Sequence, residues 1–290
     1  MAGKDLPAWA RRPFEEYLDL SEKLHEVLHL SMEGIARLRA LPDLERKMAY
    51  ARQVLAETAS ARGSTASPEH ADVLVPSEVQ EQRLKSAERL ADLALREVDD
   101  EFPILHGQAV VSLWTALESL SRNALTAWLD NDPKEIWKHE RLRKMKVALS
   151  EYQGLAPEEQ SAYVAEMVER ELGSPLGLGI GRFEGIFDVV GLAGVVEEGL
   201  RRDILELGNV RNALVHRGGV ADRRLVETCP WLGLRLGDPV KVSHSRFCAY
   251  YSAAHDYVLE RIQRMRVHFG LCRYEAPSGA TNVPPAPAAT

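Results

Sequence analysis

Three side chains around position 211 have the types that cleave a phosphodiester bond without a metal ion. Arg211 and Asn212 are adjacent, and His216 follows four residues after the asparagine. Arginine is always protonated and holds phosphate, whereas an imidazole, with an ordinary pKa of about 6.5, exchanges protons near neutral pH. We expect His216 to act as acid or base toward a ribose 2′-hydroxyl or the leaving 5′-oxygen, Arg211 to bind the phosphate, and Asn212 to orient the imidazole. Attack by a 2′-hydroxyl would make the substrate RNA.

Arg211 also interrupts a hydrophobic pattern. Four apolar residues recur at steps of four, three and seven, as in a buried helical seam: Leu200, Ile204, Leu207 and Leu214. Position 211 falls where this seam requires another apolar side chain. A guanidinium there is costly unless it is paired or faces a cavity, so the sequence predicts a partner for Arg211 in this chain, in a second chain or in a ligand.

The spacing of these residues is not specific by itself. The tetrapeptide Arg-Asn-Ala-Leu that begins at Arg211 also begins at Arg122, where no histidine follows at the same distance. A histidine near the C-terminus of a helix is favoured by the helix dipole alone, and Gly218 and Gly219 predict a helix end directly after His216.

Helical periodicity runs through most of the 290 residues. Apolar residues recur at three- and four-residue steps over 13–38, 44–55, 78–98, 110–128, 200–214 and 243–268. We therefore predict an all-α fold in which 110–128 is a central core helix and the first two helices pair antiparallel. The exception is 232–242, where two apolar runs flank Gly237 and predict one small β-hairpin.

Glycine, proline and serine mark the expected domain limits. Residues 1–62 are predicted to form an N-terminal helical pair, and 63–77 to form a linker. A larger helical domain is expected over 78–275. The tail at 276–290 is rich in proline and alanine and is predicted to be disordered.

Composition places the chain among intracellular globular proteins. Its hydrophobic content of 45% and charged content of 27% are ordinary. No stretch approaches the roughly twenty apolar residues of a membrane span, and the start lacks the apolar region of a signal peptide, so we expect a cytoplasmic protein without a membrane partner. Three cysteines lie far apart without the spacing of a zinc site, so no disulfide framework, metal or other cofactor is expected: Cys229, Cys248 and Cys272.

Charge limits any interface with nucleic acid. The net charge of -7 repels RNA on average, so contact must come from a local basic patch. Arg217, Arg223 and Arg224 follow the motif and are candidates for binding RNA. The alternative reading of these arginines is a solvated face without a ligand.

Glycine is dense between Gly173 and Gly185. Bare backbone amides approach phosphate closely, so a nucleotide-binding helical bundle with a phosphate loop here is a second alternative. The segment lacks both the Gly-x-x-x-x-Gly-Lys-Ser/Thr loop and the dinucleotide-binding fingerprint, and no predicted strand precedes it.

The stretch around the motif resembles the signature segment of HEPN domains. From Leu205 to Gly219 it reads Leu-Glu-Leu-Gly-Asn-Val-Arg-Asn-Ala-Leu-Val-His-Arg-Gly-Gly, and HEPN domains carry Arg-Asn-x-x-x-His at the end of a bundle helix. An upstream helix with Trp114-Thr-Ala-Leu-Glu118 and a Tyr-rich closing helix are similar to the family's bundle, over about residues 104–270. The resemblance implies a HEPN-like helical bundle, here with additional N-terminal helices.

The same resemblance implies a metal-independent endoribonuclease that acts as a homodimer, in which motifs of two chains form one composite site. Arg211, Asn212 and His216 would be catalytic, and Glu118 would support them by holding the arginine. Many such proteins belong to toxin–antitoxin or antiphage systems, which implies an antitoxin or another defence partner. Some relatives are not catalytic, so the alternative is a HEPN-like dimerisation or interaction module in which Arg211 forms an interface ion pair.

The chain departs from the family's pattern in two places. A long segment separates the helices that carry Trp128 and Leu200, and extra helices precede the resembling region. Both departures bear on how two copies would pair and on which RNA they would cut.

Overall fold

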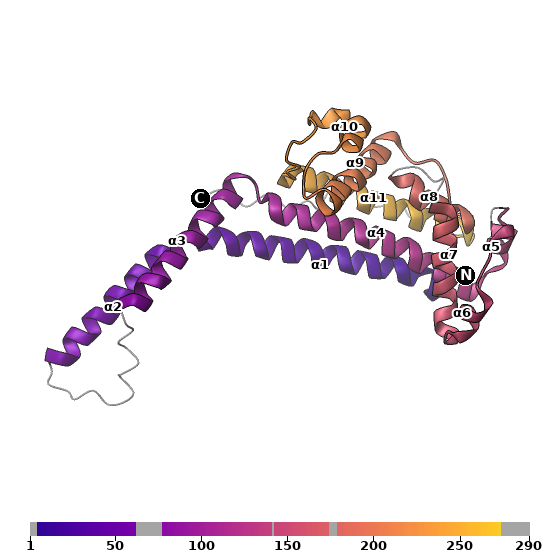
Figure 1. Cartoon of the computed structure of the whole chain (residues 1–290). Coiled ribbons are helices and arrows are strands. Elements are labelled where there is room, and N and C mark those ends of the chain that lie inside the picture. Colours follow the sequence, from indigo (N-terminus) through magenta and orange to yellow (C-terminus); the bar gives the residue numbers. More distant parts are fainter. Residues whose placement is uncertain (1–4, 62–76, 141, 174–178, 274–290) are drawn as a thin grey trace. The chain divides into compact units, whose positions relative to one another are not determined.

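The computed structural model describes residues 5–61, 77–140, 142–173 and 179–273 (Figure 1). These residues form α-helices joined by turns and two short 3₁₀ helices, so the all-α prediction is confirmed. The elements, in chain order, are α1 (Ala8–Leu38), α2 (Leu41–Ala61), α3 (Ser77–Asp99), α4 (Pro103–Asn131), α5 (Lys134–Lys138), η2 (Leu142–Lys144), α6 (Leu149–Gly154), α7 (Pro157–Gly173), α8 (Ile180–Val189), α9 (Glu198–His216), α10 (Arg223–Thr228), η3 (Pro230–Leu232) and α11 (His244–His268).

The hairpin predicted over 232–242 is not confirmed. The described residues contain no strand, only an isolated antiparallel bridge between Val220 and Pro239. Around it the amide of Ala221 donates to the carbonyl of Asp238 at 2.8 Å, so the apolar run after Gly237 pairs with the turn behind α9 rather than with the run before it. Proline has no amide hydrogen to donate, which keeps this pairing short.

Contacts divide the chain into two compact units, Met1–His25 with His106–Thr290, and Glu26–Leu105. Residues of α1 belong to both units. In the second unit α2 packs against α3 rather than back along α1, which corrects the expected pairing of the first two helices. An ion pair between Arg46 and Glu88 at 3.2 Å joins α2 to α3.

The predicted domain limits remain predictions. Of the expected linker only Ser77, the first residue of α3, lies among the described residues, and the expected tail at 276–290 lies outside them. No described helix combines the length and the apolar composition that crossing a bilayer would need.

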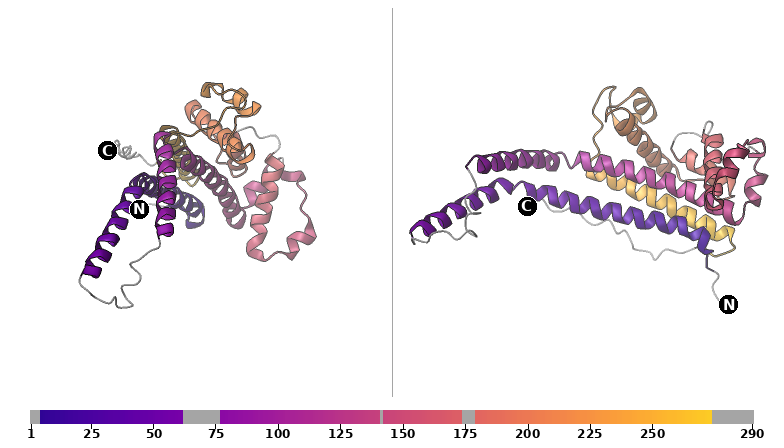
Figure 2. Two further views of the ribbon diagram at one scale, coloured as in Figure 1. Left: turned by 60° about the vertical axis from the view of Figure 1, so that its left-hand side comes forward. Right: turned by 60° about the horizontal axis from the view of Figure 1, so that its bottom comes forward.

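In the larger unit, the first part of α1 lies alongside α4 and α11 (Figures 1 and 2). Trp128 of α4 joins the three helices, because its ring lies 5.1 Å from the ring of Trp9 and 5.9 Å from that of His268. Buried positions cover more than one face of α4, as expected for a helix covered on several sides: Val110, Ala116, Leu120, Leu125 and Leu129. The prediction of a central core helix is therefore confirmed.

A glycine allows α9 to approach α4 closely. A Cβ atom on Gly208 would lie 2.7 Å from the indole of Trp114, and that indole is itself buried against Phe183 with ring centroids 5.1 Å apart. The close contact brings the face of α9 that carries Arg211 toward α4.

We expect Gly208→Ala to lower the free energy of unfolding by about 1–2 kcal/mol, because overpacking against a rigid ring outweighs the better helix propensity of alanine. Gly34→Ala in α1 is the matched control, since nothing lies within 4 Å of the Cβ it would add. That control is expected to gain up to about 1 kcal/mol. Equal gains in urea denaturation for both variants would contradict the close packing at Gly208.

Part of the glycine-rich stretch has a packing explanation. Gly179 has a φ of 65°, and a Cβ there would lie 2.7 Å from the Cα of Leu205 in α9. Glycine is therefore needed for both the backbone conformation and the close approach of α8 to α9. Residues 174–178 of the stretch lie outside the described residues.

Candidate functional site

The ends of α9 place the motif on the last turns of a well-capped helix. At the start, the Glu197 carboxylate accepts hydrogen bonds from the amides of Gly199 and Leu200, each at 3.0 Å. At the end, Gly218 and Gly219 have φ values of 63° and 75° and turn the chain away directly after His216. The imidazole therefore lies exposed at the helix C-terminus, as the sequence predicts.

The structure brings the three predicted catalytic side chains together. Arg211 and His216 are about 140° apart on an ideal helix, yet the long arginine side chain places its Nη1 3.3 Å from Nε2 of His216. The same Nη1 donates to Oδ1 of Asn212 at 3.1 Å. Asn212 therefore positions the guanidinium, whereas we expected it to orient the imidazole.

The contact between arginine and histidine has one chemical requirement. A guanidinium only donates hydrogen bonds, so Nε2 of His216 accepts from it only when the imidazole is neutral and carries its proton on Nδ1. A neutral imidazole with a free lone pair on Nε2 is the form that removes a proton from a substrate hydroxyl. In this geometry Arg211 and a substrate hydroxyl compete for the same nitrogen.

Glu118 of α4 meets the guanidinium of Arg211, as expected from the resemblance. Its Oε2 lies 3.9 Å from Nη2 of Arg211, and its Oε1 forms a 2.7 Å ion pair with Nη1 of Arg182 in α8. Two arginines thus share one carboxylate, and the cluster keeps an excess positive charge that suits an anion. Arg211 is only 20% exposed, and its Nε is buried without a hydrogen-bond partner among the described residues.

Sequence reasoning did not find Arg182. It lies in α8, within the glycine-rich stretch, and no motif connects it to Glu118 or Arg211. Its position is set by the fold, because Phe183 packs against Trp114 one turn before Glu118 on α4.

The predicted RNA-binding arginines lie beyond the helix end. Arg217 pairs with Asp222 at 3.2 Å, and Arg223 pairs with Glu227 at 2.7 Å, while Arg224 is exposed. Within the described part of the chain, the ion pairs of Arg217 and Arg223 join each arginine to an acid of its own segment and not to the cluster around Arg211. The three arginines follow His216 in the sequence and are candidates for binding RNA next to the cluster around Arg211.

A buried carboxylate on α9, that of Glu206, connects this helix to α11. Glu206 is fully buried, accepts a hydrogen bond from the hydroxyl of Tyr250 at 2.6 Å, and pairs with Arg246 at 3.1 Å. Burial, reinforced by the charge of Glu206, raises the pKa of Tyr250 and raises that of Cys229 to about 11. These contacts tie α9 to α11. A charged residue between Leu205 and Leu207 was the sequence signal for this network.

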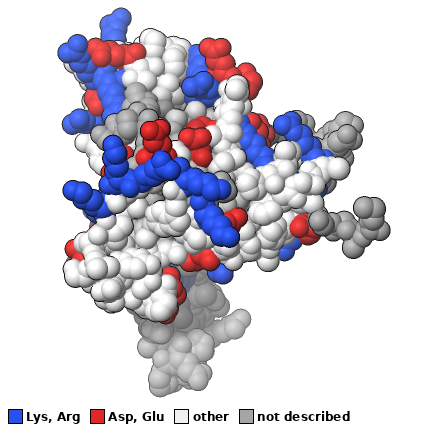
Figure 3. All heavy atoms as spheres, turned by 90° about the vertical axis from the view of Figure 1, so that its right-hand side faces the viewer, with Lys and Arg blue, Asp and Glu red and all other residues white. Residues whose placement is uncertain are grey.

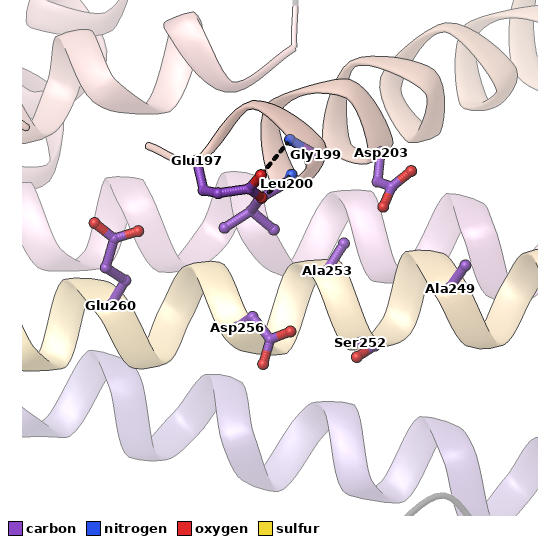
Figure 4. Close-up of a pocket in the computed structure, with 9 residues that line it drawn as sticks. All are labelled: Glu197, Gly199, Leu200, Asp203, Ala249, Ser252, Ala253, Asp256 and Glu260. Carbon is purple, nitrogen blue, oxygen red and sulfur yellow. Dashed lines mark hydrogen bonds between the residues drawn. The ribbon is translucent and has the colours of Figure 1, made fainter. Parts of the chain in front are cut away.

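A groove at the other end of α9 has the wrong charge for RNA (Figure 4). Its lining includes four acidic side chains from α9 and α11: Glu197, Asp203, Asp256 and Glu260. Burial, followed by the charge of Glu206, raises the pKa of Asp203. Along α9 the groove reaches from Glu197 to Asp203. Its nearer end is thus about 12 Å from Arg211 and about 20 Å from His216 along the helix axis, by the rise of 1.5 Å per residue.

Chemically, the cluster offers an anion site next to a proton acceptor. Among the described residues, no group of three or more His, Cys, Asp or Glu side chains is arranged to hold a metal ion. Comparison of the chain with protein-family models, with curated proteins and with solved structures finds no match. The features that bear on function are therefore the geometry around Arg211 and the resemblance of its segment to HEPN domains.

Proposed function

We propose that the chain is a metal-independent endoribonuclease of the HEPN type. The observation that supports this most directly is the position of the Arg211 guanidinium, 3.3 Å from the His216 imidazole and within an ion-pair cluster that includes Glu118. A guanidinium directed into bulk water, away from the imidazole, would have argued against the proposal. The partial burial of Arg211 strengthens its interaction with a bound phosphate, because the local dielectric is low.

In the proposed reaction, Nε2 of His216 takes the proton of a ribose 2′-hydroxyl, and the 2′-oxygen attacks the adjacent phosphorus. The bond between phosphorus and the 5′-oxygen breaks, and a proton passes to that oxygen. Arg211 holds a non-bridging phosphate oxygen and stabilises the negative charge that develops there. Glu118 and Asn212 keep the guanidinium in place. The products are a 2′,3′-cyclic phosphate and a 5′-hydroxyl.

We further propose that two copies of the chain assemble around this site as a homodimer, with the second copy supplying the acid that protonates the leaving oxygen. His216 is exposed, so a second copy has access to it. The resemblance favours a toxin or antiphage effector acting on RNA in the cytoplasm, restrained by an antitoxin or another defence partner.

The proposal predicts cleavage of single-stranded RNA in the presence of EDTA, and no cleavage of the same RNA with 2′-O-methyl groups. The reason is that methylation removes both the nucleophile and the proton that His216 accepts. Gel electrophoresis, with phosphatase and kinase treatment of the ends, would identify the cyclic phosphate. Cleavage of the methylated strand, or a requirement for a divalent ion, would contradict this mechanism.

A further inference from the structure

A second basic surface lies on the segment between α4 and α6. Residues 134–146 contain six Lys or Arg side chains and two Glu side chains, in a chain whose net charge is -7. The segment forms α5 and η2 and belongs to the same unit as the cluster around Arg211.

Two buried side chains anchor this segment, and most of its other described residues are exposed. Ile136 is fully buried and Leu142 is 3% exposed. Trp137 is 47% exposed, which is unusual for so large an aromatic residue. We name the exposed aromatic and basic side chains of this segment the Trp137 surface, which consists of Lys134, Trp137, Lys138, Arg143, Lys144 and Lys146. One exposed acid, Glu140, lies between them in the sequence.

The Trp137 surface is connected to the helix that carries Arg182. Nε2 of His139 lies 3.4 Å from a carboxylate oxygen of Asp188, near the end of α8. Arg182 is six residues earlier on this helix, about 9 Å along its axis. The Trp137 surface and Arg182 therefore lie on or beside the same helix, α8. Figure 3 shows the face on which α5 lies, where Lys and Arg side chains gather in a band.

We propose that the Trp137 surface binds single-stranded RNA, with a base stacked on the Trp137 indole and the flanking phosphates held by the basic side chains. This inference rests on the proposed function and identifies where the substrate strand lies outside the catalytic cluster. An exposed aromatic ring among cations is the combination that single strands require, because stacking and phosphate neutralisation act together. A five-residue helix with Ile136 turned inward lacks the long apolar face that inserts into a lipid surface.

The test measures binding and not activity, using the full chain and a labelled, unstructured 2′-O-methyl RNA that resists the proposed cleavage. Fluorescence anisotropy is expected to show a Kd about five- to a hundredfold weaker for Trp137→Ala, the usual range for loss of one stacked base. The double variant Arg143→Ala/Lys144→Ala is expected to reduce the slope of log binding constant against log salt by about 1.4, from 0.7 per phosphate contact on a single strand.

Matched controls come from the other unit. Tyr50→Ala removes an aromatic ring that is 70% exposed on α2, and Lys47→Ala/Arg89→Ala removes one exposed lysine and one exposed arginine. Both controls are expected to bind RNA as the unaltered chain does. Circular dichroism would show that every variant keeps its helicity.

Three outcomes would overturn the inference. The first is an equal effect of the Trp137 and Tyr50 variants on RNA binding, and the second is an unchanged salt slope in the Arg143/Lys144 variant. The third is a Trp137→Ala variant that binds RNA normally but no longer binds phosphatidylserine vesicles that the unaltered chain binds. Failure here is distinguishable from failure of the proposed function. A chain that cleaves RNA, but binds the 2′-O-methyl RNA equally well before and after Trp137→Ala, keeps its nuclease assignment and loses this surface. A chain that binds RNA through Trp137 but never cleaves it keeps the surface and loses the nuclease assignment.

Discussion

His216→Ala is expected to lower the rate of RNA cleavage by about a hundred- to ten-thousandfold, the range that positioned proton transfer contributes. The substitution removes the imidazole whose Nε2 lies 3.3 Å from Nη1 of Arg211 and takes the substrate proton in the proposed reaction. The imidazole is exposed at the end of α9 and supports no core packing, so the variant should keep its helicity and its melting temperature.

The measurement is the rate of cleavage at saturating RNA, with circular dichroism melting of the same samples. His29→Ala is a suitable control, because His29 is also exposed on a helix and lies in the other unit. A second comparison uses the tetrapeptide Arg-Asn-Ala-Leu, which occurs at Arg211 and at Arg122. Arg211→Ala should reduce cleavage strongly. Arg122→Ala should not, because Arg122 forms a 2.7 Å ion pair with Glu169 and has no place in the proposed reaction. An undiminished rate in the His216 variant would exclude the imidazole from the reaction.

Much of the fold follows from apolar periodicity, but the partners of the helices do not. Apolar residues at three- and four-residue steps over 110–128 predicted a core helix, and the structure confirms it with buried positions on more than one face of α4. The expected pairing of the first two helices was wrong, since adjacency along the chain does not determine which apolar faces meet, and α2 packs against α3. The hairpin was predicted from two apolar runs. It did not form, and Pro239, which has no amide hydrogen to donate, limits the hydrogen bonds that a strand could make at this position.

The candidate site shows a similar division between local and tertiary information. An arginine in an apolar seam predicted a partner, and the structure supplies Glu118 in the same chain. Helical geometry alone would have kept Arg211 and His216 apart, because it describes Cβ directions and neglects the reach of a guanidinium. Arg182 could not be found from sequence, since only the packing of α8 on α4 brings it to Glu118.

Glu184→Ala is expected to lower the free energy of unfolding by about 3–5 kcal/mol, the usual cost of leaving one partner of a buried ion pair uncompensated. Glu184 of α8 pairs with Arg261 of α11, which is fully buried, and with Arg264 at 3.0 Å. It also accepts a hydrogen bond from the hydroxyl of Tyr257 at 2.8 Å. Without this carboxylate, the described partners of the Arg261 guanidinium include Glu260, as an ion pair at 3.4 Å, and the ring of Tyr257, as a cation–π contact.

Urea denaturation followed by circular dichroism would measure this loss, with two graded controls. Tyr257→Phe removes one neutral donor and should cost about 1 kcal/mol. Glu166→Ala removes an exposed pair with Arg170 on α7 and should cost between about 0 and 1 kcal/mol. The expected order of destabilisation is Glu184→Ala, then Tyr257→Phe, then Glu166→Ala. Equal costs for all three would mean that the network does not hold α8 against α11, and that another contact must place Arg182 beside Glu118.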